Sequence, residues 1–431
     1  MVAARLMSRS DVKARSAGPE PQSRAMPTIG LYLGVVQFFF AATWIVYVLY
    51  LPQLAAQAGI GKGAVAWILM ADQLVFVFAD YASGVAADRV ARTIGRVGYA
   101  VLAATLVSCA AFLALPYVAP GGSPTLFIAL TMLWAVTSSA LRAPPLALVG
   151  KHAAKPSQPI LIALSLLGLG VANASAPYLG LTLRGIDPRI PFALSSAALA
   201  LVTLGLVAAE RGLARAATAR PATPLAPAAQ LEAAAGPAPV VLAAALLAAL
   251  AFQVHVFIDS APLYLRQAPQ AQLPMLSPVF WIGFNIGMLP LSLAARRWPP
   301  ARVMGIAALI AAAAAGSATA APNLSTLVAT QFIAGAAWAG VIIAAFAWAL
   351  VRGGVGHAGA FAGAISSVFA LATLARMASV AAGWPKAPGL SQVLAWWPVV
   401  GWLAASAVVV ALVMRRPGAV HRPADSGRTA P

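Results

Sequence analysis

The stretch Gly84-Val-Ala-Ala-Asp88-Arg89-Val-Ala-Arg92 decides how the rest of this sequence is interpreted. It follows directly on residues 63–87, an apolar run that is long enough to cross a bilayer. An acidic residue and two arginines therefore stand at the end of a membrane-length helix. Because charge is expensive in hydrocarbon, this stretch belongs at a membrane surface or in a functional site.

The composition does not suit a soluble globular protein. Of the 431 residues, 61% are hydrophobic and 9% are charged, whereas soluble domains contain about 25% charged residues. A net charge of +18 would also fit a nucleic-acid-binding protein. The basic residues, however, are scattered through short loops and tails and form no stripe along which a phosphate backbone could bind. We therefore predict a polytopic protein of the lipid bilayer, with no nucleic-acid partner.

Twelve segments are long and apolar enough to span a membrane, at about 20 residues each. The predicted fold class is an all-α membrane protein with these segments as its helices. They are residues 28–50, 63–87, 95–118, 124–149, 159–182, 190–209, 240–265, 275–295, 302–320, 323–350, 357–382 and 390–414.

The distribution of lysine and arginine orients the chain. With the N-terminus in the cytoplasm, 21 of the 28 basic residues fall in cytoplasmic segments and five fall in outer loops. Cytoplasmic loops of membrane proteins carry an excess of lysine and arginine. Both termini are therefore predicted to be cytoplasmic. The five outer residues are Lys62, Arg184, Arg189, Arg266 and Lys386.

The spacing G-x-x-x-D-R-x-x-R resembles the signature that follows helix 2 in the major facilitator superfamily of secondary transporters, G-x-x-x-D-R-x-G-R-K/R. The matching residues are Gly84, Asp88, Arg89 and Arg92. Ala91 replaces the second glycine and Thr93 the last basic residue. The resemblance implies two related six-helix bundles around a midplane site and transport by alternating access.

Asp88 is predicted to be a latch between the two bundles. The N-terminus of a helix carries partial positive charge and unpaired N–H groups, which attract a carboxylate. A predicted helix begins at residue 357 on the same membrane surface as Asp88, and its first turns contain Gly359 and Gly363. These glycines would allow close packing, with Arg89 and Arg92 holding the loop. In the superfamily, this contact closes the cytoplasmic side.

Residues 210–239 are rich in proline and alanine and interrupt the apolar pattern, so they are predicted to be a cytoplasmic linker. Shifting Gly84-x-Ala-Ala-Asp88-Arg89 by 208 positions gives Ser292-x-Ala-Ala-Arg296-Arg297, a weak echo between the halves. The predicted division is a tail at 1–27, bundles at 28–209 and 240–414, and a tail at 415–431.

Two acids of the predicted N-terminal bundle are candidates for function. Asp80 and Arg142 both lie about 12 Å from the cytoplasmic surface, at 1.5 Å per residue, so we expect an ion pair that is either static or moving. Asp72 lies near the bilayer centre with no basic residue at its level. An unpaired carboxyl group there is a candidate for proton coupling, or else a permanently protonated or water-bonded group.

The predicted C-terminal bundle carries three further ionisable residues. His255 and Asp259 are four residues apart and would share a helix face. Arg376 lies at a similar depth, which predicts an Asp259–Arg376 pair with His255 as a proton relay. Two ligands are too few for a metal site, so no metal and no cofactor is predicted.

Two helices contain proline in informative places. Pro144 and Pro145 remove two backbone donors beside Arg142, so a kink is expected there, with carbonyl groups free to bind a polar substrate or with no ligand. Ala172-x-x-x-Ala176-Pro177-Tyr178-Leu179-Gly180 resembles a degenerate antiporter motif, G-x-x-x-G-P-x-x-G-G. Only Pro177, Gly180 and the small residues match, and helix packing explains them equally well.

The sequence contains no G-x-x-x-x-G-K-S/T loop for ATP. The first prediction is a monomeric, proton-coupled exporter of a small organic solute, such as a drug or metabolite, in the inner membrane of a bacterium. Proton-coupled uptake of a small, anionic organic solute held by Arg142 is the alternative. An integral membrane enzyme is more remote, because the four histidines are not clustered, and the echo between the halves favours a transporter over a channel.

Overall fold

The computed structural model describes residues 21–93, 96–218 and 236–414. Within these ranges, twelve helical segments are long and apolar enough to cross a membrane, which confirms the predicted number. Residues 1–20 of the predicted N-terminal tail and the whole predicted C-terminal tail, residues 415–431, lie outside the described residues.

The N-terminal bundle contains six spans. Its helices are α2 (Pro21–Gln57), α3 (Val65–Thr93), α4 (Val97–Val118), α5 (Pro124–Ser138) with α6 (Pro144–His152), α7 (Gln158–Thr182), and α8 (Arg189–Leu204) with α9 (Leu206–Thr218).

The C-terminal bundle contains the other six. Its helices are α11 (Ala238–Val254), which continues through a π-turn (His255–Asp259) into α12 (Ser260–Leu265), followed by α13 (Leu273–Leu276), α14 (Val279–Arg297), α15 (Pro300–Thr319), α16 (Leu324–Ala381) and α17 (Leu390–Met414).

The element α16 is two spans joined by a break. Gly354 has a φ of 54°, in the left-handed region where glycine avoids the steric penalty of a side chain, and His357 is also non-helical. The first helix of α16 therefore covers Leu324–Gly354 and the second covers Gly356–Ala381.

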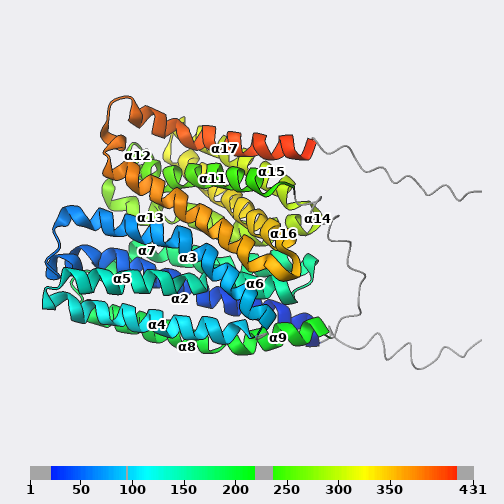
Figure 1. The fold of residues 1–431 in the computed structure, drawn as a ribbon. Helices are drawn as coiled ribbons and strands as arrows, with labels where there is room; N and C mark the ends of the chain where they lie inside the picture. Colours follow the sequence, from blue (N-terminus) through cyan, green and yellow to red (C-terminus); the bar gives the residue numbers. More distant parts are fainter. Residues whose placement is uncertain (1–20, 94–95, 219–235, 415–431) are drawn as a thin grey trace, which may run out of the picture.

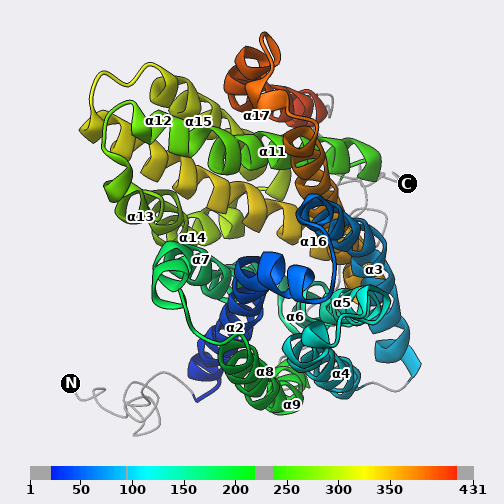
Figure 2. The ribbon, with the colours of Figure 1, turned by 90° about the vertical axis from the view of Figure 1, so that its left-hand side faces the viewer.

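The two bundles lie side by side with their helices roughly parallel to one long direction (Figure 1). Figure 2 looks along that direction and separates α2 to α9, below, from α11 to α17, above. The main contacts between bundles are α3 against α16 and α7 against α14. A site at this interface is therefore built by both halves of the chain.

Close helix packing occurs in α14 at a G-x-x-x-G spacing, Gly283 and Gly287. A Cβ atom on Gly283 would overlap the carbonyl oxygen of Phe332, and one on Gly287 would come within 2.8 Å of the Ala336 Cα atom. Both neighbours belong to the first helix of α16, so these two glycines let the two backbones meet.

The start of the predicted linker is different from what its composition suggested. Residues 210–218 are helical, because Leu206, Ala209 and Leu213 bury one face of α9 against the bundle. The proline-rich part, residues 219–235, lies outside the described residues. The helical part thus belongs structurally to the N-terminal bundle.

Candidate functional site

Asp88 forms the predicted contact with the second helix of α16. Its Oδ1 atom accepts a hydrogen bond from the N–H of Gly359 at 2.8 Å, and Oδ2 accepts one from the N–H of Ala360 at 2.7 Å. The carboxylate is 6% exposed and satisfies two of the N–H groups that a helix start leaves unpaired. It therefore joins α3 of one bundle to α16 of the other.

Glycines make this contact close. A Cβ atom on Gly84 would overlap the carbonyl oxygen of Gly359, and a Cβ on Gly363 would meet the backbone of α3 at Asp80. We call Gly84, Asp88 and Arg92 together with Gly356, Gly359 and Ala360 the latch, and the end of the molecule that contains it the latch end.

The two arginines of the motif behave differently. The Nη1 atom of Arg92 donates a hydrogen bond to the carbonyl oxygen of Gly356 at 2.7 Å, across the bundle interface. The Arg89 side chain is exposed and makes no comparable contact with the described residues. Of the two, Arg92 alone is therefore seen to hold the latch.

A cavity of about 740 Å³ lies between the bundles, lined by α2, α3, α6 and α7 from one side and by α11, the π-turn and α16 from the other. It reaches Ala66 in the first turn of α3 and Ala381 at the end of α16, both far from the latch along their helices. The bundles are in contact at the latch end, and the cavity extends to the opposite end of the molecule.

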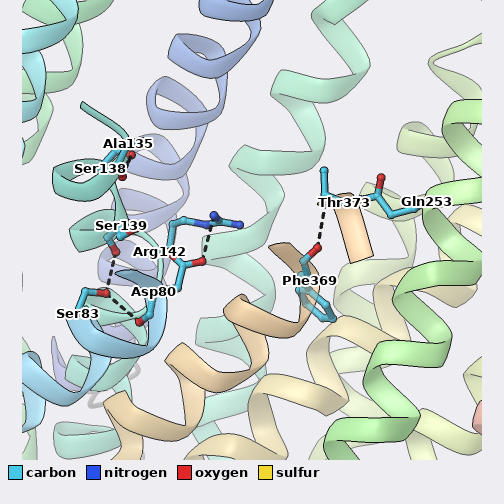
Figure 3. A network of polar contacts seen from close by, with 9 residues as sticks. All are labelled: Asp80, Ser83, Ala135, Ser138, Ser139, Arg142, Gln253, Phe369 and Thr373. Carbon is cyan, nitrogen blue, oxygen red and sulfur yellow. Dashed lines mark hydrogen bonds and ion pairs between the residues drawn. The ribbon is translucent and has the colours of Figure 1, made fainter. Parts of the chain in front are cut away.

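The predicted Asp80–Arg142 ion pair forms, with Arg142 Nη1 3.0 Å from Asp80 Oδ2 (Figure 3). Asp80 is fully buried, whereas 24% of the Arg142 side chain is exposed and lines the cavity. The guanidinium lies over the Phe76 ring, 4.7 Å from its centroid. The buried Asp80 carboxylate thus balances the charge of Arg142, whose guanidinium is still accessible from the cavity.

The predicted kink beside Arg142 is a full break. Helix α5 ends at Ser138, a 3-10 turn covers Ser139–Leu141, and α6 begins at Pro144. Two carbonyl groups of the break accept hydrogen bonds from side chains of the same bundle. The Gln37 amide donates to Leu141 O at 2.6 Å, and the Ser83 hydroxyl donates to Ser139 O at 3.2 Å. These two carbonyls therefore stabilise the break.

The predicted Asp259–Arg376 pair is wrong. Arg376 Nε instead donates to Gln253 Oε1 at 2.9 Å, and its guanidinium lies over the Phe257 ring, 4.9 Å from the centroid. Among the described residues, Asp80 and Arg142 form the only ion pair. The π-turn that contains Asp259 changes the angular position of the side chains that follow, which sequence spacing alone does not reveal.

His255 and Asp259 are the first and last residues of this π-turn. His255 is buried in the C-terminal bundle, with Nε2 3.1 Å from Gln331 Oε1 and its ring against Trp402. Asp259 is half-buried, and its Oδ2 atom has no hydrogen-bond partner among the described residues. Among the described residues, no hydrogen bond joins the two side chains, and the relay role of His255 stays a prediction.

Asp72 lies inside the N-terminal bundle, as its lack of a basic neighbour suggested. It is fully buried, and Oδ2 accepts a hydrogen bond from the Tyr47 hydroxyl at 2.6 Å. Oδ1 is buried without a partner among the described residues. The Tyr47 ring also contacts the Trp44 ring, with 5.4 Å between the centroids and 45° between the planes, and Trp44 lines the cavity.

Sequence reasoning missed two polar residues. Glu210, assigned to the linker, is 6% exposed and accepts hydrogen bonds from the N–H groups of Val97 and Gly98 at 2.9 and 2.8 Å. A lone acid on the apolar face of α9 was the signal that could have revealed it. Gln253 gave no such signal, because a single amide in an apolar helix resembles any packing residue.

The α7 motif residues have separate places. Pro177 lies inside the helix, and Gly180 lines the cavity near its end opposite the latch end. Within the described ranges, no three His, Cys, Asp or Glu side chains lie close enough together to hold a metal ion.

Comparison with known protein families gives a match over most of the chain. The family model described as Major Facilitator Superfamily matches residues 33–376, more than half of the chain. A search of curated protein sequences finds no match.

Three solved structures illustrate the similarity of fold. The human organic anion transporter MFSD10 (TETRAN) has a TM-score of 0.61 and 14% identity, covering 92% of this chain and 99% of its own. A bacterial homologue of the iron transporter ferroportin, in an outward-facing state, has a TM-score of 0.63 and 15% identity, covering 90% and 100%. The E. coli fucose:proton symporter FucP has a TM-score of 0.55 and 12% identity, covering 90% and 98%.

Proposed function

The chain belongs to the Major Facilitator Superfamily, and we propose that it is a secondary active transporter that exports a small organic solute in exchange for protons. Members of this family and the similar structures are transporters rather than enzymes, so the membrane-enzyme alternative is set aside. The observation that carries the proposal is the cavity of about 740 Å³ between the two bundles.

The latch and the cavity together support alternating access. Asp88 and the glycines hold the bundles together at the latch end, while the cavity extends toward the other end. Opening the latch and closing the far end would expose the same cavity on the other side. A solute bound between the bundles would then cross the membrane without a continuous pore.

Asp72 is the proposed proton-coupling residue. Its carboxyl group has one oxygen bonded to Tyr47 and one without a partner among the described residues, and no cation lies beside it. A group that is buried without a counter-charge changes its interactions strongly when it gains or loses a proton. Asp259, half-buried and unpaired at Oδ2, is the second candidate.

Direction and orientation complete the proposal. Export rests on the partial α7 motif of Pro177 and Gly180, and the reverse direction, uptake of an anionic solute, is the alternative. The excess of lysine and arginine supports a cytoplasmic location for the latch end, both termini and residues 210–239. The protein would act as a monomer in the inner membrane of a bacterium.

The orientation can be tested by cysteine labelling in a Cys109→Ala background. Thr218, exposed at the end of α9, and Lys386, exposed near the other end, provide the two positions. An impermeant maleimide should label Lys386→Cys in intact cells and Thr218→Cys only after permeabilisation. Labelling of Thr218→Cys in intact cells would mean that the topology is the reverse of the one proposed.

Transport itself can be tested in proteoliposomes that carry a pH gradient. Organic acids, amines and neutral solutes are added one at a time, and internal pH is recorded against protein-free liposomes. We expect a solute-dependent pH change that Asp72→Asn abolishes, while exchange of labelled solute without a gradient persists. Asp187→Asn, at an exposed loop carboxylate, is the matched control and should behave as wild type. Normal gradient-driven transport by Asp72→Asn would remove this residue from the coupling mechanism.

A further inference from the structure

Two arginines face the cavity from opposite bundles in matching environments. Arg142 lies over the ring of Phe76 and Arg376 over the ring of Phe257, with 4.7 and 4.9 Å from each guanidinium carbon to the ring centroid. Both cations and both rings line the cavity. A cation over an aromatic face is held in place while its polar edges stay free to bind a ligand.

The two cations differ in how their charge is compensated. Arg142 has the buried carboxylate of Asp80 at 3.0 Å. Arg376 has only the neutral amide of Gln253, and its terminal Nη groups make no ion pair or hydrogen bond with the described residues. Among the described residues, the cavity lining contains two arginines and no acidic residue. Counting Asp80 behind Arg142, the site therefore carries one unmatched positive charge.

The orientation of Gln253 favours this arrangement. Its Nε2 atom donates to the Thr373 hydroxyl at 2.8 Å, and that hydroxyl donates to the carbonyl oxygen of Phe369 at 2.9 Å. The chain of hydrogen bonds, part of which is drawn in Figure 3, turns the amide oxygen toward Arg376 Nε. Gln253 and Thr373 thus position the guanidinium without neutralising it.

The rest of the lining is mostly apolar and aromatic. Besides Phe76 and Phe257, the cavity is lined by four further aromatic residues: Phe40, Trp44, Phe346 and Phe369. A bare inorganic ion would leave most of this surface without a partner. A ligand that matches both features has one anionic group and an apolar body.

We propose that the cavity takes small organic monoanions with an apolar or aromatic body, and that their carboxylate or equivalent group binds the Arg376 guanidinium. The planar guanidinium matches a carboxylate with two parallel hydrogen bonds, which an ammonium cannot reproduce. One negative charge on the ligand balances the one unmatched positive charge. This inference rests on the proposed transport function, because it takes the cavity as the substrate site.

The test compares acids with their uncharged isosteres on the purified full-length protein. Thermal unfolding in detergent is recorded with benzoate, 2-naphthoate and indole-3-acetate, with the corresponding primary amides, and with 2-naphthylmethylamine. The chloride concentration is kept low and identical in every sample, so that competition by chloride does not differ between ligands. We expect the acids to raise the unfolding temperature in a saturable way and the amides and the amine to have no such effect.

Variants then locate the binding group. Arg376→Gln should weaken acid binding about tenfold or more, since hydrogen bonds to charged groups are the strong ones. Arg376→Lys should bind more weakly than wild type but better than Arg376→Gln. Lys386→Gln removes the same charge from an exposed loop and should bind as wild type.

The acid–amide comparison on the wild-type chain keeps the proposal falsifiable even where Arg376→Gln fails to fold. Equal stabilisation by amides, stronger stabilisation by the amine, or no stabilisation by any acid would overturn the ligand class. Acid binding without gradient-driven movement in proteoliposomes would leave the ligand class standing and contradict the transport function. Transport of neutral or cationic solutes with no acid binding would do the reverse.

Discussion

Two carboxylates in this molecule cap helix N-termini with the same geometry but in different places. Asp88 binds the N–H groups of Gly359 and Ala360, and Glu210 binds those of Val97 and Gly98, all at 2.7–2.9 Å. Each acid is 6% exposed. The first cap joins the two bundles, while the second joins α9 to α4 inside one bundle.

The difference shows that placement, not chemistry, decides whether such a cap can act as a switch. The stabilisation from a carboxylate at a helix N-terminus is about 0.3–2 kcal/mol in either place. For Glu210 that energy contributes to the folded bundle in every conformation. For Asp88 we expect it to be present only while the bundles are in contact at the latch end, and therefore to bias the conformational equilibrium.

The largest effect is expected from Gly359→Ala. A Cβ atom there would overlap the carbonyl oxygen of Gly84 and crowd Asp88 Oδ1, so α3 and α16 must separate. Overpacking costs typically about 1–3 kcal/mol, which is up to about a hundredfold in the closed population. Electron–electron distances between spin labels at Thr93→Cys and Arg297→Cys, in a Cys109→Ala background, would report the separation.

The matched control for this change is Gly98→Ala. Its Cβ would meet Glu210 Oε2 at 2.9 Å, the tip of a flexible side chain within one bundle. We expect a modest loss of thermal stability and unchanged label distances. A closed distance distribution in Gly359→Ala, or an opened one in Gly98→Ala, would break the comparison.

The next effect is expected from removing the charge of each cap. Asp88→Asn should shift the latch end toward the open state by up to about thirtyfold and slow turnover, because up to about 2 kcal/mol of helix-terminus interaction is lost. Glu210→Gln should leave the label distances unchanged. Its thermal midpoint should instead fall by a few degrees, at about 2–4 °C per kcal/mol for a domain of this size.

These two variants separate the explanations cleanly when measured side by side. Asp88→Asn with an unchanged distance distribution would mean that the latch does not control opening. A change of distances in Glu210→Gln would mean that α9 and α4 also move between the two states.

Much of the latch could be predicted from the sequence, because each of its two partners is marked by residues that lie close together in the chain. The Gly84-x-x-x-Asp88 spacing marks one partner, and a helix start with Gly359 and Gly363 marks the other. Charge bias placed both on one membrane surface, and the resemblance to the superfamily, in which this contact closes the cytoplasmic side, brought them together in the prediction. The Asp80–Arg142 pair followed in the same way from depth along two neighbouring helices.

The C-terminal half of the cavity could not be predicted as well. Asp259 was predicted to lie beside Arg376 from its depth along a regular α-helix, whereas the helix contains a π-turn at His255–Asp259. An insertion of this kind has no sequence signature of its own. Gln253, the neutral partner of Arg376, was also missed, because partners were sought only among charged residues.

The smallest effect is expected from Arg92→Gln. The guanidinium donates one hydrogen bond to Gly356 O at an exposed position, where water competes for both groups. Such a bond contributes about 0.5–1.5 kcal/mol at most, so the closed population should fall by about two- to tenfold, less than in Asp88→Asn. Its counterpart is Arg211→Gln, which removes an exposed 2.8 Å bond to the Tyr99 hydroxyl between α9 and α4. That change should leave the label distances as they are, because both partners belong to one bundle. If Arg92→Gln opened the latch end more than Asp88→Asn, the arginine rather than the helix cap would be the principal element of the latch.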